Sequence, residues 1–215
     1  MLITCHGHSE FYLEAQNGFK LLTDPFDDHV GYPMGQYPCD AVTVSHGHGD
    51  HNCVQKALGA PAIVDSEGVW KVSPEVTVTA IPSFHDDEGG KKRGNNLLMK
   101  IEMEGLTIVH LGDQGCALTE DQIKALGSVD LLMIPVGGFY TIDAAMAFAI
   151  CEALKPRMIL PMHYKTKANI SWPITDEKPF LQLLGCEALS PMPLLRVTKG
   201  DLSEQPRVAL LQANP

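Results

Sequence analysis

The chain is poor in the features that mark secreted or membrane-bound proteins. Its 215 residues contain six scattered cysteines and no C-x-x-C pair, which favours reduced thiols in a cytosolic protein over a disulfide scaffold. The first residues, MLITCHGHSE, lack the basic region and apolar run of a signal peptide. No apolar stretch is long enough to cross a bilayer. We therefore expect a cytoplasmic protein without a membrane partner.

Positive charge is also scarce. Sixteen Lys and Arg residues face 26 Asp and Glu residues, which gives a formal net charge of −10. Such a surface repels polyphosphate, so no nucleic-acid partner is expected. The one basic cluster, Lys91-Lys92-Arg93, is too small for a nucleic-acid groove. A run of this kind is more often solvated surface, but beside a functional site it could hold a phosphate or carboxylate.

The remaining pattern predicts one domain over residues 1–215, made of strands with helices between groups of them. Hydrophobic residues form 45% of the chain, enough for a buried core. Hairpins are predicted around Asn17-Gly18 and Glu104-Gly105. The other predicted strands are DAVTVS, PAIVD, EVTVTAI, VDLLMIPV, RMILPM and two short strands near the end. The predicted helices are NCVQKALG, LTEDQIKALG with Thr119 as N-cap, TIDAAMAFAICEALK and TDEKPFLQLLG. This order indicates sheets covered by helices.

One short stretch, SHGHGDHN at residues 45–52, concentrates metal-binding side chains. His46 and His48 are two residues apart, so in an extended segment they point to the same side and can reach one ion. Asp50 and His51 follow as the chain turns, which places them better for a second ion. Imidazoles and carboxylates are ligands for zinc and related divalent metals. The stretch therefore predicts part of a metal site with two ions.

Further ligands are available at three other junctions between a predicted strand and a loop. His85 lies in a polar loop after a strand, Asp113 in VHLGDQG, and His163 in LPMHYKT. Ligands that repeatedly follow strand ends suggest a site built along one edge of a scaffold. His6 and His29 are not expected to be ligands, and His110 is expected to point elsewhere.

The order of these motifs resembles the metallo-β-lactamase-fold hydrolases. The motif H-x-H-x-D-H stands here as His46, His48, Asp50 and His51, and the later family positions are matched by His85, Asp113 and His163. Within that superfamily, GHS, DPF, HLGDQG, IPVGGFYTIDA and PMHYKT are most similar to the branch of L-ascorbate-6-phosphate lactonase and its uncharacterised bacterial relatives.

The resemblance implies an α+β fold, a four-layer αββα sandwich, with two metal ions at one edge. One ion would be held by three histidines, the other by two histidines and an aspartate, and a further aspartate would bridge them. The implied sets are His46, His48 and His85 for one ion, Asp50, His51 and His163 for the other, and Asp113 as the bridge. The ions are expected to be Zn²⁺, with Mn²⁺ or Fe as alternatives.

This arrangement predicts a hydrolase that acts on a small anionic ester, lactone or phosphoester through a metal-bound hydroxide. Asp50 would be catalytic, because it binds one ion and also orients the nucleophile. No G-x-S-x-G motif is present to supply a serine nucleophile. His8, Asp24 and Tyr164 are expected near the ligands or the substrate, with Asp24 holding ligand histidines in place. Tyr140 is a further candidate donor to an oxyanion.

Three other functions fit the residues less well. A mononuclear iron enzyme that oxygenates a thiol or sulfur is the main alternative on the same fold. A nuclease conflicts with the acidic net charge. A non-catalytic binding module conflicts with a full ligand set. The expected partner is a small molecule, and a homo-oligomer is an open possibility.

Overall fold

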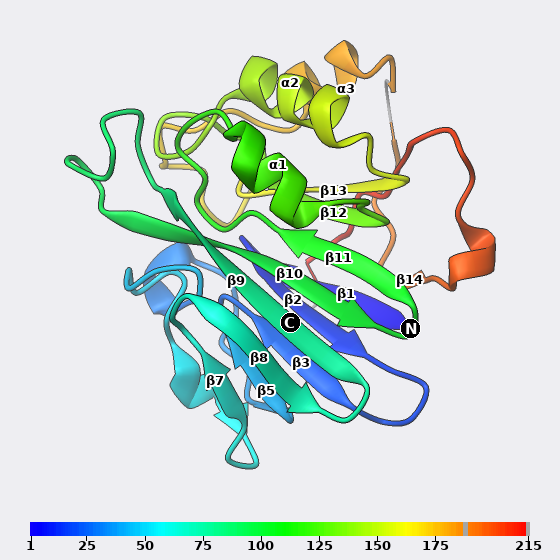
Figure 1. Cartoon of the computed structure of the whole chain (residues 1–215). Helices are drawn as coiled ribbons and strands as arrows, with labels where there is room; N and C mark the ends of the chain where they lie inside the picture. The colour runs from blue at the N-terminus through cyan, green and yellow to red at the C-terminus, as the bar shows by residue number, and fades with distance from the viewer. Residues whose placement is uncertain (187–188, 214–215) are drawn as a thin grey trace.

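Two β-sheets pack face to face and carry most of the core (Figure 1). The computed structural model describes residues 1–186 and 189–213. The first sheet has the order β14-β1-β2-β3-β5-β7, with bounds Leu195–Arg196, Leu2–Gly7, Glu10–Glu14, Lys20–Thr23, Ala41–Thr43 and Ala62–Val64. The second has the order β15-β13-β12-β11-β10-β9-β8, with bounds Arg207–Val208, Met158–Met162, Leu131–Pro135, Leu106–His110, Asn95–Met103, Val76–Phe84 and Gly68–Ser73. Both predicted hairpins, β2-β3 and β10-β11, are confirmed.

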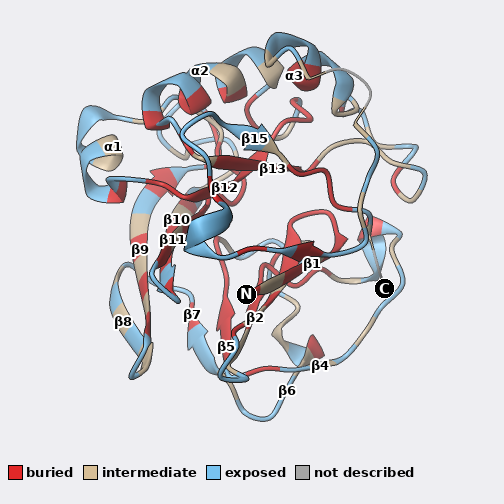
Figure 2. Ribbon diagram, turned by 90° about the vertical axis from the view of Figure 1, so that its right-hand side faces the viewer, coloured by how far each residue is buried: buried red, intermediate tan, exposed pale blue. Residues whose placement is uncertain are grey.

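The main hydrophobic core lies between the two sheets. Leu13 of the first sheet and Ile101 and Leu160 of the second belong to one cluster and are fully buried. Figure 2 shows this burial along the strands of both sheets. Burial of apolar side chains on the inner faces is what holds two sheets together in a sandwich.

Three α-helices cover the outer face of the second sheet (Figure 1). They are α1 (Glu120–Leu126), α2 (Ala144–Leu154) and α3 (Lys178–Leu183). Thr119 caps α1, as predicted. It also forms a full capping box, because its side chain and that of Gln122 each accept a bond from the other's backbone N–H. The buried residues of α2, among them Ala147 and Ile150, recur at helical spacing and pack on the sheet.

The outer face of the first sheet is covered differently, and the helix predicted over NCVQKALG is wrong. Its residues form a 3₁₀ turn, η2 (Val54–Lys56), followed by β6 (Ala57–Leu58), which pairs with β4 (Tyr37–Pro38). Two contacts override helix propensity here. The Lys56 ammonium turns inward to the Glu10 carboxylate, and the next two residues extend to meet β4. The fourth layer of the sandwich is therefore thin among the described residues. Two other 3₁₀ turns are η1 (Asp28–Val30) and η3 (Lys199–Asp201).

Strand direction determines where the functional loops lie. β1 and β3 each run antiparallel to β2, and β3 is parallel to β5. In the second sheet, β9 and β11 each run antiparallel to β10, and β11 continues through β12 to β13 in parallel. Each sheet therefore sends the ends of several strands to one edge, among them β1, β3 and β5 from the first sheet and β9, β11 and β13 from the second. No helix within residues 1–186 and 189–213 is long and apolar enough to span a membrane.

Candidate metal centre

The polar residues singled out in the sequence follow these six strand ends. His8 follows β1, Asp24 follows β3, and the 46–51 stretch comes shortly after β5. His85 follows β9, and His163 follows β13. Asp113 comes shortly after β11. The structure brings the side chains of all these loops together at one edge, from both sheets.

The first group, termed here the imidazole cluster, consists of His46, His48 and His85. Each offers a ring nitrogen, and these nitrogens all lie within 4.8 Å of one another. His46 Nε2 lies 3.0 Å from His48 Nδ1. Burial, together with the neighbouring His51, lowers the pKa of His46 to about 3, so its ring is neutral and able to bind a cation at pH 7. His48 is exposed, whereas His85 is buried.

The second group, termed here the carboxylate cluster, consists of His8, Asp50, His51 and His163. Their ligand atoms also lie within 4.8 Å of one another. His8 Nε2 lies 3.4 Å from Asp50 Oδ2, and burial lowers the pKa of His8 to about 4. Burial opposes the charge of Asp50, but its contacts with His8 and His51 outweigh burial and lower its pKa. The sequence placed His8 only near the pocket; the structure places it inside this group.

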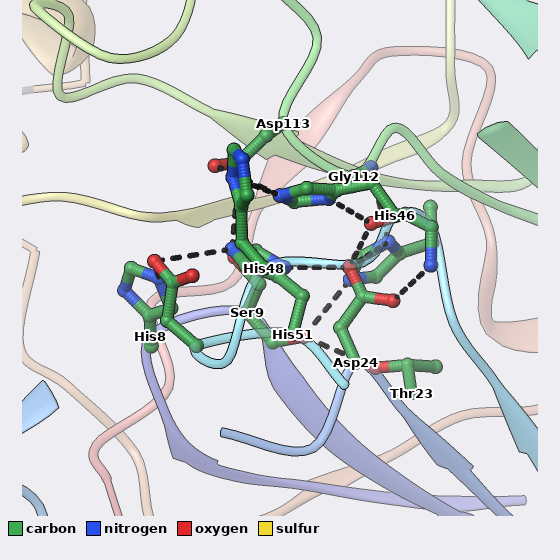
Figure 3. Close-up of polar contacts among 12 residues, drawn as sticks. His8, Ser9, Thr23, Asp24, His46, His48, His51, Gly112 and Asp113 are labelled. Atoms are coloured by element: carbon green, nitrogen blue, oxygen red, sulfur yellow. Dashed lines mark hydrogen bonds and ion pairs between the residues drawn. The ribbon is translucent and has the colours of Figure 1, made fainter. Parts of the chain in front are cut away.

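Asp113 connects the two clusters (Figure 3). Its Oδ2 lies 3.2 Å from His85 Nε2 and 3.3 Å from His163 Nε2, and its Oδ1 lies 3.1 Å from His51 Nε2. Burial alone would raise its pKa, but the surrounding histidines hold the pKa well below its usual range. One buried carboxylate thus faces members of both groups.

Asp24 supports the carboxylate cluster from behind (Figure 3). It is fully buried and accepts a bond from His51 Nδ1 at 2.8 Å and one from the backbone N–H of Ser45 at 2.7 Å. The Ser45 hydroxyl also donates to it. A carboxylate behind an imidazole fixes the ring so that its other nitrogen, here Nε2, faces the cluster.

The backbone at this edge adopts unusual conformations. His8, Asp24 and His163 have φ values of 55°, 39° and 51°, in the left-handed region that non-glycine residues seldom occupy. Gly112, just before Asp113, has φ 56°, and a Cβ there would lie 2.5 Å from that of Ser45. Strain of this kind persists where surrounding contacts fix a functional arrangement.

The two clusters fit divalent cations. Several of their buried polar atoms have no hydrogen-bond partner, including both ring nitrogens of His8 and of His163, His51 Nε2 and Asp113 Oδ1. Buried polar atoms are normally satisfied, and imidazole nitrogens with carboxylate oxygens are a donor set that zinc, manganese and iron accept. A bound cation would satisfy one ring nitrogen of each of these histidines and the Asp113 carboxylate oxygen.

A small pocket of about 290 Å³ opens on the clusters. It is lined by His48, Asp50, His85, Lys92, Arg93, Asp113, Tyr140 and Trp172. The sequence singled out Tyr140 but missed Trp172, which lies in an irregular loop after β13 without any periodic signal. Tyr164, predicted near the ligands or the substrate, lines a second cavity of about 740 Å³ that His8 and His163 also line.

Three histidines stay outside the clusters, as the sequence indicated. His6 bonds Glu10 at 2.8 Å and stacks on Tyr37. His29 is exposed. His110 contacts the Ser9 carbonyl at 2.9 Å.

Known proteins share both the sequence pattern and the fold. Residues 2–163 match the Beta-lactamase superfamily domain model. The chain is 30% identical to a UPF0173 metal-dependent hydrolase of Pyrococcus furiosus, over 86% of this chain and 93% of that protein. It is also 30% identical to one of Carboxydothermus hydrogenoformans, over 81% of this chain and 87% of that protein. A solved structure from Thermotoga maritima, assigned to the Zn-dependent hydrolases of the metallo-β-lactamase superfamily, has a TM-score of 0.80 and 31% identity. It covers 98% of this chain and 97% of its own.

The fold and the domain match make the chain a member of the metallo-β-lactamase superfamily. Within it, the chain belongs to the UPF0173 metal-dependent hydrolases. It is thus a metal-dependent hydrolase, and the predicted fold class and enzyme class are confirmed.

Proposed function

We propose that the protein holds two divalent metal ions and hydrolyses a small anionic ester, lactone or phosphoester. The observation that carries this proposal is the pair of ligand clusters that face a single carboxylate, Asp113. One cluster alone would serve one ion. Two clusters on a common aspartate suit two ions close together.

The imidazole cluster would hold one ion and the carboxylate cluster the other, with Asp113 between them. His8 adds a fourth member to the second set, beyond the three ligands that the family resemblance implies. When bound, the two ions lower the pKa of a water molecule and stabilise negative charge on the attacked group.

Asp50 has the position and charge for proton handling. Its side chain is 24% exposed and lines the small pocket, so it can accept a hydrogen bond from an attacking water. Its lowered pKa keeps it ionised at neutral pH. After it takes the proton, it can deliver that proton to the leaving group, which is general acid–base catalysis by one carboxylate.

The pocket indicates a small substrate. A volume of about 290 Å³ is at the low end for ligand sites. The guanidinium of Arg93 on its wall favours a negatively charged substrate. The resemblance to the L-ascorbate-6-phosphate lactonase branch makes a lactone the first bond to test. Zn²⁺ is the leading metal, with Mn²⁺ and Fe accepted by the same donors.

The test is elemental analysis of protein purified without added metal or chelator, together with turnover of lactones, esters and phosphoesters. We expect about two zinc or manganese ions per chain, and their loss in an Asp50→Ala, His163→Ala double variant. The control is an Asp27→Ala, His29→Ala variant, which removes the same residue types from a more exposed acidic group that also could hold an ion. One iron per chain with oxygen uptake would instead favour the redox alternative, and absence of metal under all loading conditions would refute the proposal.

A further inference from the structure

The loop between β9 and β10 is held by a single carboxylate. Asp86 Oδ1 accepts bonds from the backbone N–H groups of Glu88 and Gly90 at 2.8 and 2.9 Å. Its Oδ2 accepts from those of Lys92 and Arg93 at 2.9 and 2.8 Å. Burial opposes the charge, but these four donors outweigh it and lower the pKa of Asp86 to about 2. The backbone of both basic residues is therefore fixed beside the ligand clusters.

The three basic residues of this loop are not equivalent. Lys91 is exposed and does not line the pocket. The Lys92 ammonium pairs with Glu88 at 2.7 Å and with Asp87 at 3.3 Å. Arg93 has no carboxylate partner within the part of the chain that the structure describes. Only Arg93 combines a place in the pocket wall with an unneutralised charge.

The loop between β12 and α2 also orients Arg93. Its Nη2 donates to the Phe139 carbonyl at 3.0 Å, and its Cζ lies 5.8 Å from the centre of the Tyr140 ring. Phe139 has φ 60°, a strained conformation for a side chain of this size. The Tyr140 ring in turn meets Trp172 edge to face, with centroids 5.8 Å apart. A guanidinium and two aromatic rings thus form one wall of the pocket.

We propose that Arg93 is the residue that selects the substrate, by binding a phosphate or carboxylate group separate from the bond that is cleaved. A guanidinium binds such groups through two parallel hydrogen bonds. The surface as a whole has a charge of −10 and repels anions, so a local positive group would orient an anionic substrate in the pocket. Tyr140 and Trp172 would contact the body of the substrate. This proposal rests on the proposed function. It adds which chemical group of the substrate is recognised and which residue binds that group.

The experiment compares substrates that share one scissile ester. Phenyl acetate is neutral, 4-acetoxybenzoate adds a carboxylate, and 4-acetoxyphenylphosphonate adds a phosphonate, which has the shape and charge of a phosphate but no second ester bond. The measured quantity is kcat/KM for each anionic ester relative to the neutral ester, with the metal-loaded protein. Arg93→Ala should lower this ratio about 10- to 100-fold, the range expected for charge-assisted hydrogen bonds, and Arg93→Lys should lower it less. Comparison of the ratios for the two anionic esters shows which anion the site prefers.

Lys91→Ala is the matched control, because it removes the same charge from the same loop outside the pocket, and it should leave the ratio unchanged. A second readout does not need turnover: Trp172 fluorescence in a Trp70→Phe background, titrated with benzoate and phenylphosphonate. Here Arg93→Ala should weaken binding by a similar factor.

The two proposals fail in different ways. If ester hydrolysis and metal content stand but Arg93→Ala changes neither the ratio nor the anion affinity, the selection by Arg93 is refuted and the hydrolase remains. If the protein holds no metal and cleaves no ester, the hydrolase mechanism fails, and the fluorescence titration still decides whether Arg93 binds anions.

Discussion

The imidazole cluster and the carboxylate cluster share Asp113 but differ in charge and in support. The first contains only imidazole rings, and one of them, that of His48, is exposed. The second contains a carboxylate of its own, and Asp24 fixes His51 from behind. Since a negative ligand and a fixed ring both favour a divalent cation, we expect the carboxylate cluster to hold its ion more tightly.

The difference suggests a division of roles. Asp24 and its partners are fully buried, so the support behind the carboxylate cluster is rigid. The imidazole cluster contributes His48 and His85 to the small pocket where the substrate would bind, and the carboxylate cluster contributes Asp50. Because His48 is exposed, an ion in the imidazole cluster would be easier to exchange.

The largest expected effect comes from removing what the clusters share. Asp113→Ala should release both ions and reduce activity by more than the roughly 10–100-fold typical of residues that only support ligands. Elemental analysis and kcat/KM on an aryl ester measure both quantities. Asp121→Ala, on the exposed surface of α1, is the control. Retention of two ions by the Asp113 variant would show that the clusters do not depend on a common carboxylate.

His48→Ala should separate the clusters. Because this residue belongs only to the imidazole cluster, we expect the metal content to fall by about half, with the remaining ion resisting chelation as in the parent protein. The measurement is metal content after timed dialysis against a chelator. Simultaneous loss of both ions would contradict independent binding.

Asp24→Asn tests the support behind the second cluster. We expect metal affinity to fall roughly 10–100-fold there, as for other residues behind metal ligands, while the imidazole cluster keeps its affinity. Competition with a fluorescent chelator gives the two affinities. Asp130→Asn is a matched control, since it also alters a buried carboxylate with backbone and lysine contacts but lies outside the site. Equal loss of metal in both variants would indicate general destabilisation.

The smallest expected effect is on how the melting temperature of the metal-free protein depends on pH. Burial opposes the charge of His51, but Asp113 and Asp24 raise its pKa well above the usual value. A group with a raised folded-state pKa stabilises the fold below its unfolded pKa, near 6.5, and that contribution is lost as pH rises through the folded pKa. The melting temperature of metal-free protein should therefore fall as pH rises above about 6.5. His51→Gln should flatten this slope, and an unchanged slope would exclude His51 as its source.

Much of this edge could be predicted from the sequence because its ligands follow strand ends. The strands before His85, Asp113 and His163 are long or buried, with strong apolar patterns. β8 was missed because it is a partly exposed edge strand with a weak pattern. The helix over residues 52–59 failed because Lys56 finds a buried partner in Glu10, which no local pattern reveals. Trp172 and the membership of His8 depend on contacts between distant segments.

The meeting of strand ends from both sheets has a mechanical consequence. At the far edge of the sandwich, a hydrogen bond joins the two hairpin turns: Glu104 in one turn accepts it from the backbone N–H of Gln16 in the other. Glu104 also forms an ion pair with the N-terminal ammonium. At the near edge, hydrogen bonds such as that from the His163 backbone N–H to the His8 carbonyl at 3.2 Å already join the two sheets, and ions bound by residues 8 to 163 would add to them. Because such ions bind only the assembled edge, their binding free energy adds to the free energy of unfolding. Metal supply would thus set how readily one end of the sandwich opens, and hydrogen exchange should spread inward from that end when the metal is withdrawn.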